Sequence, residues 1–335
     1  MIAKHIANRA STTNSHHHSK LHLLIVDEEI PPNKIFASCA SVQRLSCSSM
    51  MVSNMGGENL IAMGQMCSTS DMQHNLDQAK ILVAKAVEAG AKALFLPEAS
   101  DYISHTGPES LSLVRSVNDS IYVQGLRKEA KDNKIAITAG IHEPGESWSG
   151  KIKNTAIWIS EDGEIVQRYQ KLHLFDMELT DGPHAHEGDI IEEGAEIHPP
   201  FQTSVGMVGL LICFDLRFPE VTLSLKRQGA QILTYPSAFT VPTGKAHWET
   251  LLRARAIETQ SYVIAAAQAG YHNQVPGRVS YGHSMIVSPW GQIIAELGGD
   301  FDGPEIATAA IDLAVVDKLR NEVPLRRRTD VYPKV

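Results

Sequence analysis

A cysteine, a glutamate and a lysine of this chain each follow directly on a short apolar run. They are Cys213 in Leu-Leu-Ile-Cys-Phe-Asp, Glu98 in Leu-Phe-Leu-Pro-Glu, and Lys171 in Tyr-Gln-Lys-Leu-His. A cysteine taken alone is more often a buried structural residue, because free cysteine packs as a small hydrophobe. Side chains at strand ends of open α/β sheets, however, lie in the crevice where ligands bind. The three residues together therefore predict an active site.

These residue types suit the hydrolysis of an amide through a thioester. A carboxylate such as Glu98 can take the thiol proton of Cys213, and the sulfur then attacks the carbonyl carbon. The ammonium of Lys171 and the backbone N–H of Phe214 would hold the resulting oxyanion, which is typically worth about 10²–10³ in rate per donor. Backbone N–H groups at the turn also lead us to expect a thiolate at Cys213.

The elements around these residues follow from hydrophobic spacing. Apolar residues at helical intervals predict a helix that ends before Gly90, and Asp162-Gly163 predicts the turn of a hairpin. A further amphipathic helix is expected to start at once after the strand that precedes Cys213. The predicted strands are 60–67, 93–96, 155–159, 164–169 and 207–212, and the predicted helices are 76–89 and 219–227.

The order Glu98, Lys171, Cys213, with these flanking residues, resembles the nitrilase superfamily of carbon–nitrogen hydrolases from about residue 59 to residue 332. The resemblance is closest to its Nit branch, which contains omega-amidases and deaminated-glutathione amidases. The motif Tyr-Pro-Ser-Ala-Phe-Thr at 235–240 is more similar to the deaminated-glutathione amidases. The resemblance implies an α/β fold in a four-layer α-β-β-α sandwich, a homodimer or higher homo-oligomer, and no metal or organic cofactor. The segments that carry the Nit-branch likeness are 212–220, 233–244, 247–258 and 281–284.

The same resemblance assigns roles to catalytic residues. Glu98 matches the general base, Lys171 the oxyanion-stabilising lysine and Cys213 the nucleophile of a Glu-Lys-Cys triad. The family has a second glutamate between the lysine and the cysteine, and Glu187 in His-Ala-His-Glu-Gly is the best-placed candidate. It would position the lysine and keep it charged. The competing candidates are Glu178, Glu192 and Glu193.

Three further residues match the substrate-binding positions of the family. Arg217, four residues after the nucleophile, matches an arginine expected to grip a substrate carboxylate. Thr243 matches a hydroxyl donor to the same end of the substrate, and Phe239 a wall of the pocket. The family commonly has threonine where this chain has Pro242, so the loop differs there.

The resemblance points to a small amide that bears a carboxylate as the substrate. Deaminated glutathione would be hydrolysed to an α-keto acid and Cys-Gly, which is a metabolite-repair reaction. The alternative is an omega-amidase that acts on α-ketoglutaramate. A non-catalytic scaffold or signalling protein with the same fold is an alternative from a different functional class. A papain-like protease is disfavoured because this chain lacks the Cys-Gly-x-Cys-Trp motif around the cysteine. A nitrile-cleaving enzyme agrees less well with the Nit-branch motifs. A glycosidase that used Glu98 and Glu187 would give Cys213 and Lys171 no role.

The composition of the chain argues against nucleic acid and membranes as partners. The chain has 335 residues, 43% of them hydrophobic, and a formal net charge of −8, which argues against nucleic acid despite the short basic run 326–328. No apolar run approaches the ~20 residues that span a membrane. The four cysteines show no zinc or disulfide spacing, and Cys67 is expected in the core. One hydrolase domain is therefore predicted over 59–335.

Residues 1–58 have a different composition. There is no Asp or Glu before Asp27, and Lys, Arg, Ser, Thr and His are frequent, as in organelle transit peptides, although acidic residues and prolines follow. We expect this segment to be disordered or removed. The protein is expected in the cytoplasm, and also in a plastid or mitochondrion if the segment directs import.

Overall fold

The computed structural model describes residues 59–145, 150–177, 185–274 and 278–333. All of them belong to one compact unit, Asn54–Val335. The predicted extension 1–58 lies outside the described residues, so the expectations for it stay predictions. Within the described ranges, no helix is both long and apolar enough to cross a membrane.

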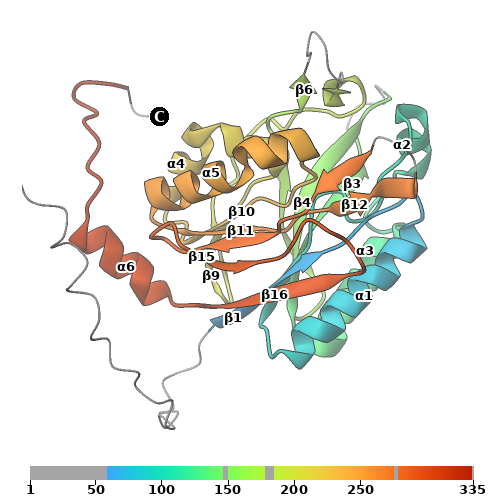
Figure 1. Ribbon diagram of the computed structural model, residues 1–335, viewed down its shortest axis with the longest axis horizontal. Helices are drawn as coiled ribbons and strands as arrows, with labels where there is room; N and C mark the ends of the chain where they lie inside the picture. Colours follow the sequence, from blue (N-terminus) through green and yellow to red (C-terminus); the bar gives the residue numbers. More distant parts are fainter. Residues whose placement is uncertain (1–58, 146–149, 178–184, 275–277, 334–335) are drawn as a thin grey trace, which may run out of the picture. The chain divides into compact units, whose positions relative to one another are not determined.

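Two six-stranded mixed sheets pack against each other (Figure 1). Between them the rings of Phe95, Trp158 and Phe201 meet edge to face, with centroids 5.7 and 5.6 Å apart in the two successive pairs. In order across the sheet, the first contains β16 (Glu305–Ile311), β1 (Asn59–Gln65), β2 (Ala93–Phe95), β3 (Ala136–Pro144), β4 (Ile152–Ile159) and β5 (Ile165–Gln170). The second contains β15 (Ile293–Glu296), β14 (Met285–Val287), β11 (Tyr262–Ala265), β10 (Ile232–Thr234), β9 (Gly206–Leu210) and β8 (Phe201–Thr203).

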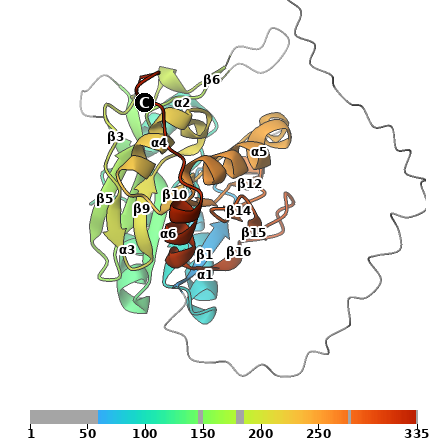
Figure 2. The same ribbon diagram turned by 90° about the vertical axis from the view of Figure 1, so that its left-hand side faces the viewer.

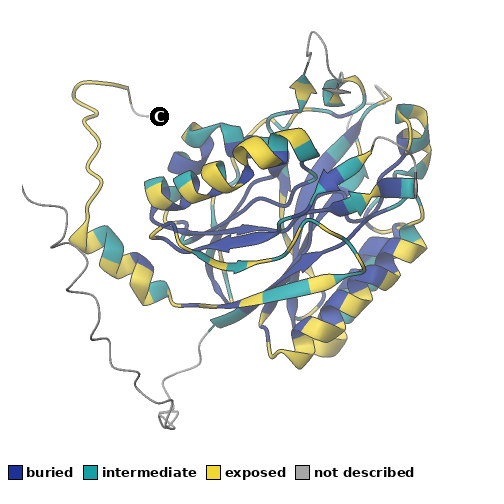
Figure 3. Cartoon of the chain, viewed as in Figure 1, coloured by how far each residue is buried: buried dark blue, intermediate teal, exposed yellow. Residues whose placement is uncertain are grey.

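Helices cover the outer face of each sheet. The helices α1 (Met72–Glu88) and α3 (Ile121–Asn133) pack on the first sheet, and α4 (Pro219–Arg227) and α5 (Val241–Thr259) pack on the second (Figures 1 and 2). Their inward faces are buried and their outward faces exposed (Figure 3). The predicted four-layer α-β-β-α sandwich is therefore confirmed.

Shorter elements complete the described chain. Two helices, α2 (Gly107–Leu113) and α6 (Leu313–Glu322), and two small hairpins lie outside the main layers. The hairpins are β6 (Asp176–Met177) with β7 (Ala185–His186), and β12 (Ala269–Tyr271) with β13 (Val279–Tyr281). The 3₁₀ turns are η1 (Glu187–Asp189), η2 (Cys213–Arg217) and η3 (His272–Gln274).

Strand directions determine where the predicted catalytic residues meet. β2 runs parallel to β3, and β3 and β5 both run antiparallel to β4, so β2 and β5 end at the same edge of the first sheet. Glu98 and Lys171 follow these two strands. Cys213 follows β9 of the second sheet, which is parallel to β10. The active-site residues are thus contributed by both sheets.

Candidate active site

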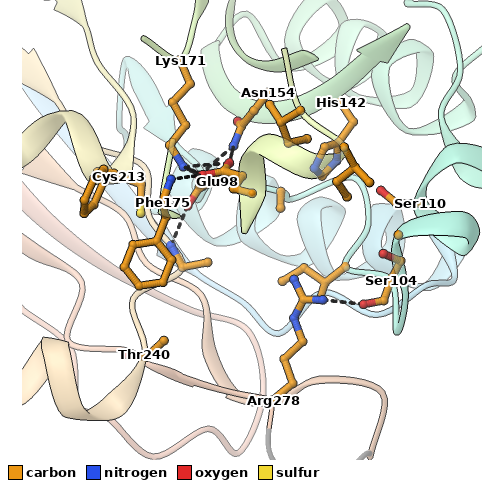
Figure 4. A pocket seen from close by; sticks show the side chains of 18 of the residues that line it. Glu98, Ser104, Ser110, His142, Asn154, Lys171, Phe175, Cys213, Thr240 and Arg278 are labelled. Atoms are coloured by element: carbon orange, nitrogen blue, oxygen red, sulfur yellow. Dashed lines mark hydrogen bonds and ion pairs between the residues drawn. The ribbon is translucent and has the colours of Figure 1, made fainter. Parts of the chain in front are cut away.

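All eight residues predicted from the sequence line one cavity of about 360 Å³ (Figure 4). The cavity lies where the turns that follow β2, β5 and β9 converge. These residues are Glu98, Lys171, Glu187, Cys213, Phe214, Arg217, Phe239 and Thr243.

Glu98 is buried and hydrogen-bonded through both of its carboxylate oxygens. Its Oε1 accepts from Lys171 Nζ at 2.9 Å and from Asn154 Nδ2 at 2.8 Å, and its Oε2 accepts from the backbone N–H of Ala238 at 2.9 Å. The turn that carries Glu98 packs tightly on β3 at Gly140. A Cβ at Gly140 would lie 2.5 Å from the Glu98 Cα, so only glycine allows this approach.

Lys171 is buried between two carboxylates. Its Nζ donates to Glu98 at 2.9 Å and to the two oxygens of Glu187 at 2.9 and 2.8 Å. Burial by itself would lower the pKa of Lys171, but the charges of Glu187 and Glu98 outweigh burial and raise this pKa well above its usual value. The amine is therefore an ammonium at every physiological pH, as an oxyanion-binding group needs to be.

Glu187 opens the 3₁₀ turn η1 and also accepts from Phe175 N at 2.7 Å and Asn154 Nδ2 at 3.1 Å. Burial acts to raise the pKa of Glu187, but Lys171 and these hydrogen bonds together lower it, so the carboxylate stays charged. Of the competing glutamates, Glu192 and Glu193 do not line the cavity. Glu178 lies outside the described residues.

Cys213 is the first residue of η2 and has a strained backbone, with φ at +42°. The predicted helix 219–227 is found as α4, and the 3₁₀ turn η2 lies between β9 and this helix. The buried carboxylate of Asp215 holds this turn. It accepts from Ile212 N at 3.0 Å, Tyr169 Oη at 2.7 Å and His173 Nδ1 at 2.7 Å, so it links the Cys213 turn to the strand end near Lys171.

The thiol of Cys213 is protonated at rest. Burial and the negative charge of Glu98 raise the pKa of Cys213 well above its usual value, and the opposing effects of Lys171 and the Ala238 N–H are smaller. The expectation that backbone N–H groups would favour a thiolate is therefore wrong for the resting site, and attack requires a base. The Phe214 N–H donates to no other described residue, so it is available to an oxyanion.

The residues predicted to bind substrate line the same cavity as Cys213. The Arg217 guanidinium lies over the rings of Phe214 and Phe239, 5.5 and 5.9 Å from their centroids, and its Nη2 is 3.2 Å from His247 Nδ1. Phe239 is buried, packs on Trp248 and lines the cavity. Thr243 lines the cavity, but its hydroxyl is 2.8 Å from the Thr240 hydroxyl and so already has a partner.

Some residues of the site were not predicted from the sequence. Asn154 on β4 donates to both Glu98 and Glu187, and the backbone N–H of Ala238 after β10 supports Glu98. Asp215, two residues after the nucleophile, fixes its turn. The Asp215 position in Cys-Phe-Asp was a usable signal, because an acid in so apolar a run needs partners. An asparagine in a strand and a backbone amide give no such signal.

A metal-binding cluster is not found in the part of the chain that the structure describes, where no three or more His, Cys, Asp or Glu side chains are grouped to hold an ion. The charged and nucleophilic groups that line the cavity include a thiol, two carboxylates, an ammonium and two guanidinium groups.

Comparisons with known proteins match most of the chain. The carbon–nitrogen hydrolase family model matches residues 60–321. The chain is 45% identical over 278 residues to the probable hydrolase nit2 of Schizosaccharomyces pombe, covering 82% of this chain and 99% of that protein. It is 42% identical over 277 residues to the deaminated glutathione amidase of Mus musculus, covering 82% and 84%.

A solved structure agrees with these relatives. The crystal structure of the C. elegans NitFhit protein matches with a TM-score of 0.77 and 42% identity, covering 82% of this chain and 66% of that one. This chain belongs to the carbon–nitrogen hydrolase family, in the Nit branch of the nitrilase superfamily, and is an amidase.

Proposed function

We propose that this protein hydrolyses the amide bond of deaminated glutathione, releasing an α-keto acid and Cys-Gly through a thioester on Cys213. The observation that carries the proposal is the shared cavity, in which Cys213, Glu98 and Lys171 lie beside the guanidinium of Arg217. That guanidinium has no ion pair with any carboxylate of the described chain. The relative named deaminated glutathione amidase, at 42% identity, supports the choice of substrate.

The first half of the reaction forms the thioester. Glu98 takes the proton of the Cys213 thiol, and the sulfur attacks the amide carbonyl carbon. The negative charge that develops on the oxygen is held by Lys171 Nζ and the Phe214 N–H. When the C–N bond breaks, Glu98 gives its proton to the departing nitrogen, and Cys-Gly leaves as an amine.

The second half of the reaction hydrolyses the thioester. Glu98, again a carboxylate, takes a proton from water, and the hydroxide attacks the thioester carbonyl while Lys171 and the Phe214 N–H hold the oxyanion once more. The C–S bond breaks, and the sulfur of Cys213 recovers its proton from Glu98. One amide bond and one water are consumed, and one carboxylic acid and one amine are formed.

The guanidinium of Arg217 is the proposed partner of the carboxylate next to the keto group. Its position over Phe214 and Phe239 leaves donors free for a bidentate contact, which arginine makes better than lysine. Phe239 would pack along the carbon chain of the substrate. Because α-ketoglutaramate carries the same carboxylate, an omega-amidase is the second candidate function.

Steady-state turnover separates these functions. We would measure kcat/KM for deaminated glutathione, α-ketoglutaramate and a simple aliphatic nitrile, with Cys213→Ala as the blank. A kcat/KM for deaminated glutathione well above the others is expected. A preference for α-ketoglutaramate would make the protein an omega-amidase, and no turnover of any of them would favour a scaffold or signalling role.

The assembly and the compartment are part of the same proposal. A homodimer is supported by two large exposed apolar side chains, Ile257 on α5 and Trp290 in the turn between β14 and β15, which are 51% and 63% exposed. Sedimentation velocity of the wild type and of Trp290→Lys would test it, and two monomeric samples would contradict it.

A cytoplasmic enzyme, with import directed by 1–58, would be tested by locating fluorescent fusions with and without that segment.

A further inference from the structure

The cavity has a second polar region on the side away from Cys213 (Figure 4). It is lined by Ser104, Ser110, His142 and Arg278 (Figure 4). Arg278 reaches it from the residue before β13, and its Nη1 donates to the carbonyl oxygen of Ser104 at 2.5 Å. This contact orients the guanidinium toward the cavity and uses one of its five N–H donors.

Arg278 has no carboxylate within ion-pair distance among the residues that the structure describes. Two acidic side chains are near enough for their charges to influence it, Glu98 and Glu109. Both are already engaged, because Glu98 accepts three hydrogen bonds and Glu109 accepts from His105 N at 2.6 Å. Although Arg278 as a whole residue is exposed, packing around its side chain lowers its pKa through burial.

The two arginines reach the cavity from different elements. Arg217 is the last residue of η2, the same 3₁₀ turn that Cys213 begins. Arg278 is the residue before β13 and is held at the cavity by the carbonyl oxygen of Ser104. A substrate whose scissile amide lies between them would thus meet a cation on each side. Such a substrate needs two anionic groups, one at each end.

Deaminated glutathione has this distribution of charge. One carboxylate adjoins its keto group, and the other ends the Cys-Gly portion, two residues beyond the scissile carbonyl. Two extended residues reach about 7 Å. α-Ketoglutaramate has only the first carboxylate. Cavities of this size commonly enclose a whole small ligand.

We propose that Arg278 binds the C-terminal carboxylate of the Cys-Gly portion and so distinguishes deaminated glutathione from shorter amides. The inference rests on the proposed function and names a specificity-determining residue for it. Ser104 acts as a positioning residue, because its carbonyl holds the guanidinium in place. His142, whose Nδ1 is 3.0 Å from Asp101 Oδ1, borders the same region.

The test combines a change in the protein with a change in the substrate. Arg278→Gln and the wild type are assayed with deaminated glutathione, with its glycinamide analogue, which lacks the terminal charge, and with α-ketoglutaramate. Arg278→Gln should lower kcat/KM for deaminated glutathione by about 10- to 100-fold, mainly through KM, the usual worth of a hydrogen bond between charged groups. It should change the other two substrates by less than about threefold. The wild type should lose the same factor when the glycinamide analogue replaces the acid.

Two controls accompany this comparison. Arg253→Gln removes an exposed charge that pairs with Glu249 on α5 and does not line the cavity, so all three substrates should be unaffected. Arg278→Lys keeps the charge and should recover part of the lost kcat/KM. An unchanged rate of Cys213 alkylation by iodoacetamide shows that the site of each variant is intact.

The possible outcomes separate this inference from the proposed function. Equal losses by Arg278→Gln on all three substrates, or a wild type that accepts the glycinamide analogue as well as the acid, would overturn the Arg278 subsite alone. A wild type that hydrolyses α-ketoglutaramate but not deaminated glutathione would overturn the proposed function, and the subsite with it.

Discussion

Replacing Glu187 by glutamine tests how much Lys171 depends on its second carboxylate. Four contacts converge on Glu187, and all of them come from donors: Lys171 Nζ at 2.9 and 2.8 Å, Asn154 Nδ2 at 3.1 Å and Phe175 N at 2.7 Å. A glutamine keeps one acceptor oxygen and turns an NH₂ group toward donors, so at least one charged hydrogen bond is lost. Such a bond is worth about 1.5–3 kcal/mol, and an unfavourable donor contact is added. We expect the free energy of unfolding to fall by about 3 kcal/mol.

The fold should survive this change, because Lys171 keeps Glu98 as a counterion at 2.9 Å. Turnover should suffer more than substrate binding. An ammonium held by Glu98 alone moves away from the oxyanion position, and losing one oxyanion donor typically costs about 10²–10³ in kcat. KM should change by only a few-fold, since the arginines of the cavity are untouched. Steady-state kinetics and urea unfolding measure both effects.

The matched control is Glu193→Gln, which changes an exposed glutamate outside the cavity and should alter neither quantity. The pH dependence gives a further check. Burial acts to raise the pKa of Glu187, but Lys171 and the hydrogen bonds lower it below the unfolded value of 4.5. Its stabilising effect is therefore complete above about pH 4.5 and is lost as pH falls through the lower folded value. A kcat within threefold of wild type, or a stability difference that persists unchanged to pH 3, would refute the reasoning.

Three further predictions concern the thiol, the carboxylate end of the cavity and a buried histidine. Glu98→Gln should reduce kcat at least about 10²-fold. It should also lower the pKa of Cys213, because a neighbouring negative charge is removed. The pH profile of iodoacetamide labelling measures this pKa, and a midpoint above that of the wild type would contradict the prediction. Arg217→Gln should raise KM about 10- to 100-fold for 2-oxo acid amides but not for an uncharged aliphatic amide, and equal losses on both would remove its assigned role. Burial lowers the pKa of His272 from 6.5 to about 4, so the fold should lose up to about 3 kcal/mol as pH falls from 6.5 to about 4. His272→Gln should flatten this decline, and an unchanged slope would be evidence against it.

The local elements of this fold were predictable because each has its own hydrophobic period. The helix 219–227 is found with the predicted bounds, and β2 differs from the prediction by one residue. The helix α1 starts at Met72, four residues before the predicted start, because the Asp71 side chain caps it by accepting from Gln73 N and His74 N. Polar residues at its exposed N-terminus carry no apolar signal.

What the sequence could not show depends on contacts between distant segments. Catalytic residues that follow strands were expected to lie close together. That they come from two different sheets depends on strand pairings such as β9 with β10, which no local sequence pattern encodes. The protonation of Cys213 is another case, since its raised pKa depends on burial in the folded chain and on the Glu98 carboxylate, 115 positions earlier in the sequence. Arg278 is a third, because only the folded chain brings it to the carbonyl of Ser104.

The arrangement of charges explains why the proposed reaction uses two carboxylates around one lysine. At rest the buried group contains Glu98⁻, Glu187⁻ and Lys171⁺, a net charge of −1. In the proposed attack, the proton of Cys213 passes to Glu98 while a negative charge appears on the substrate oxygen, so the net charge stays at −1. A buried site that keeps its net charge avoids a new desolvation cost during the reaction, because its dipoles are already oriented. During that step Glu98 is neutral and can no longer act as the counterion of Lys171. Glu187 takes no part in the proton transfer and remains charged, so it keeps the lysine an ammonium at the moment when the oxyanion needs it.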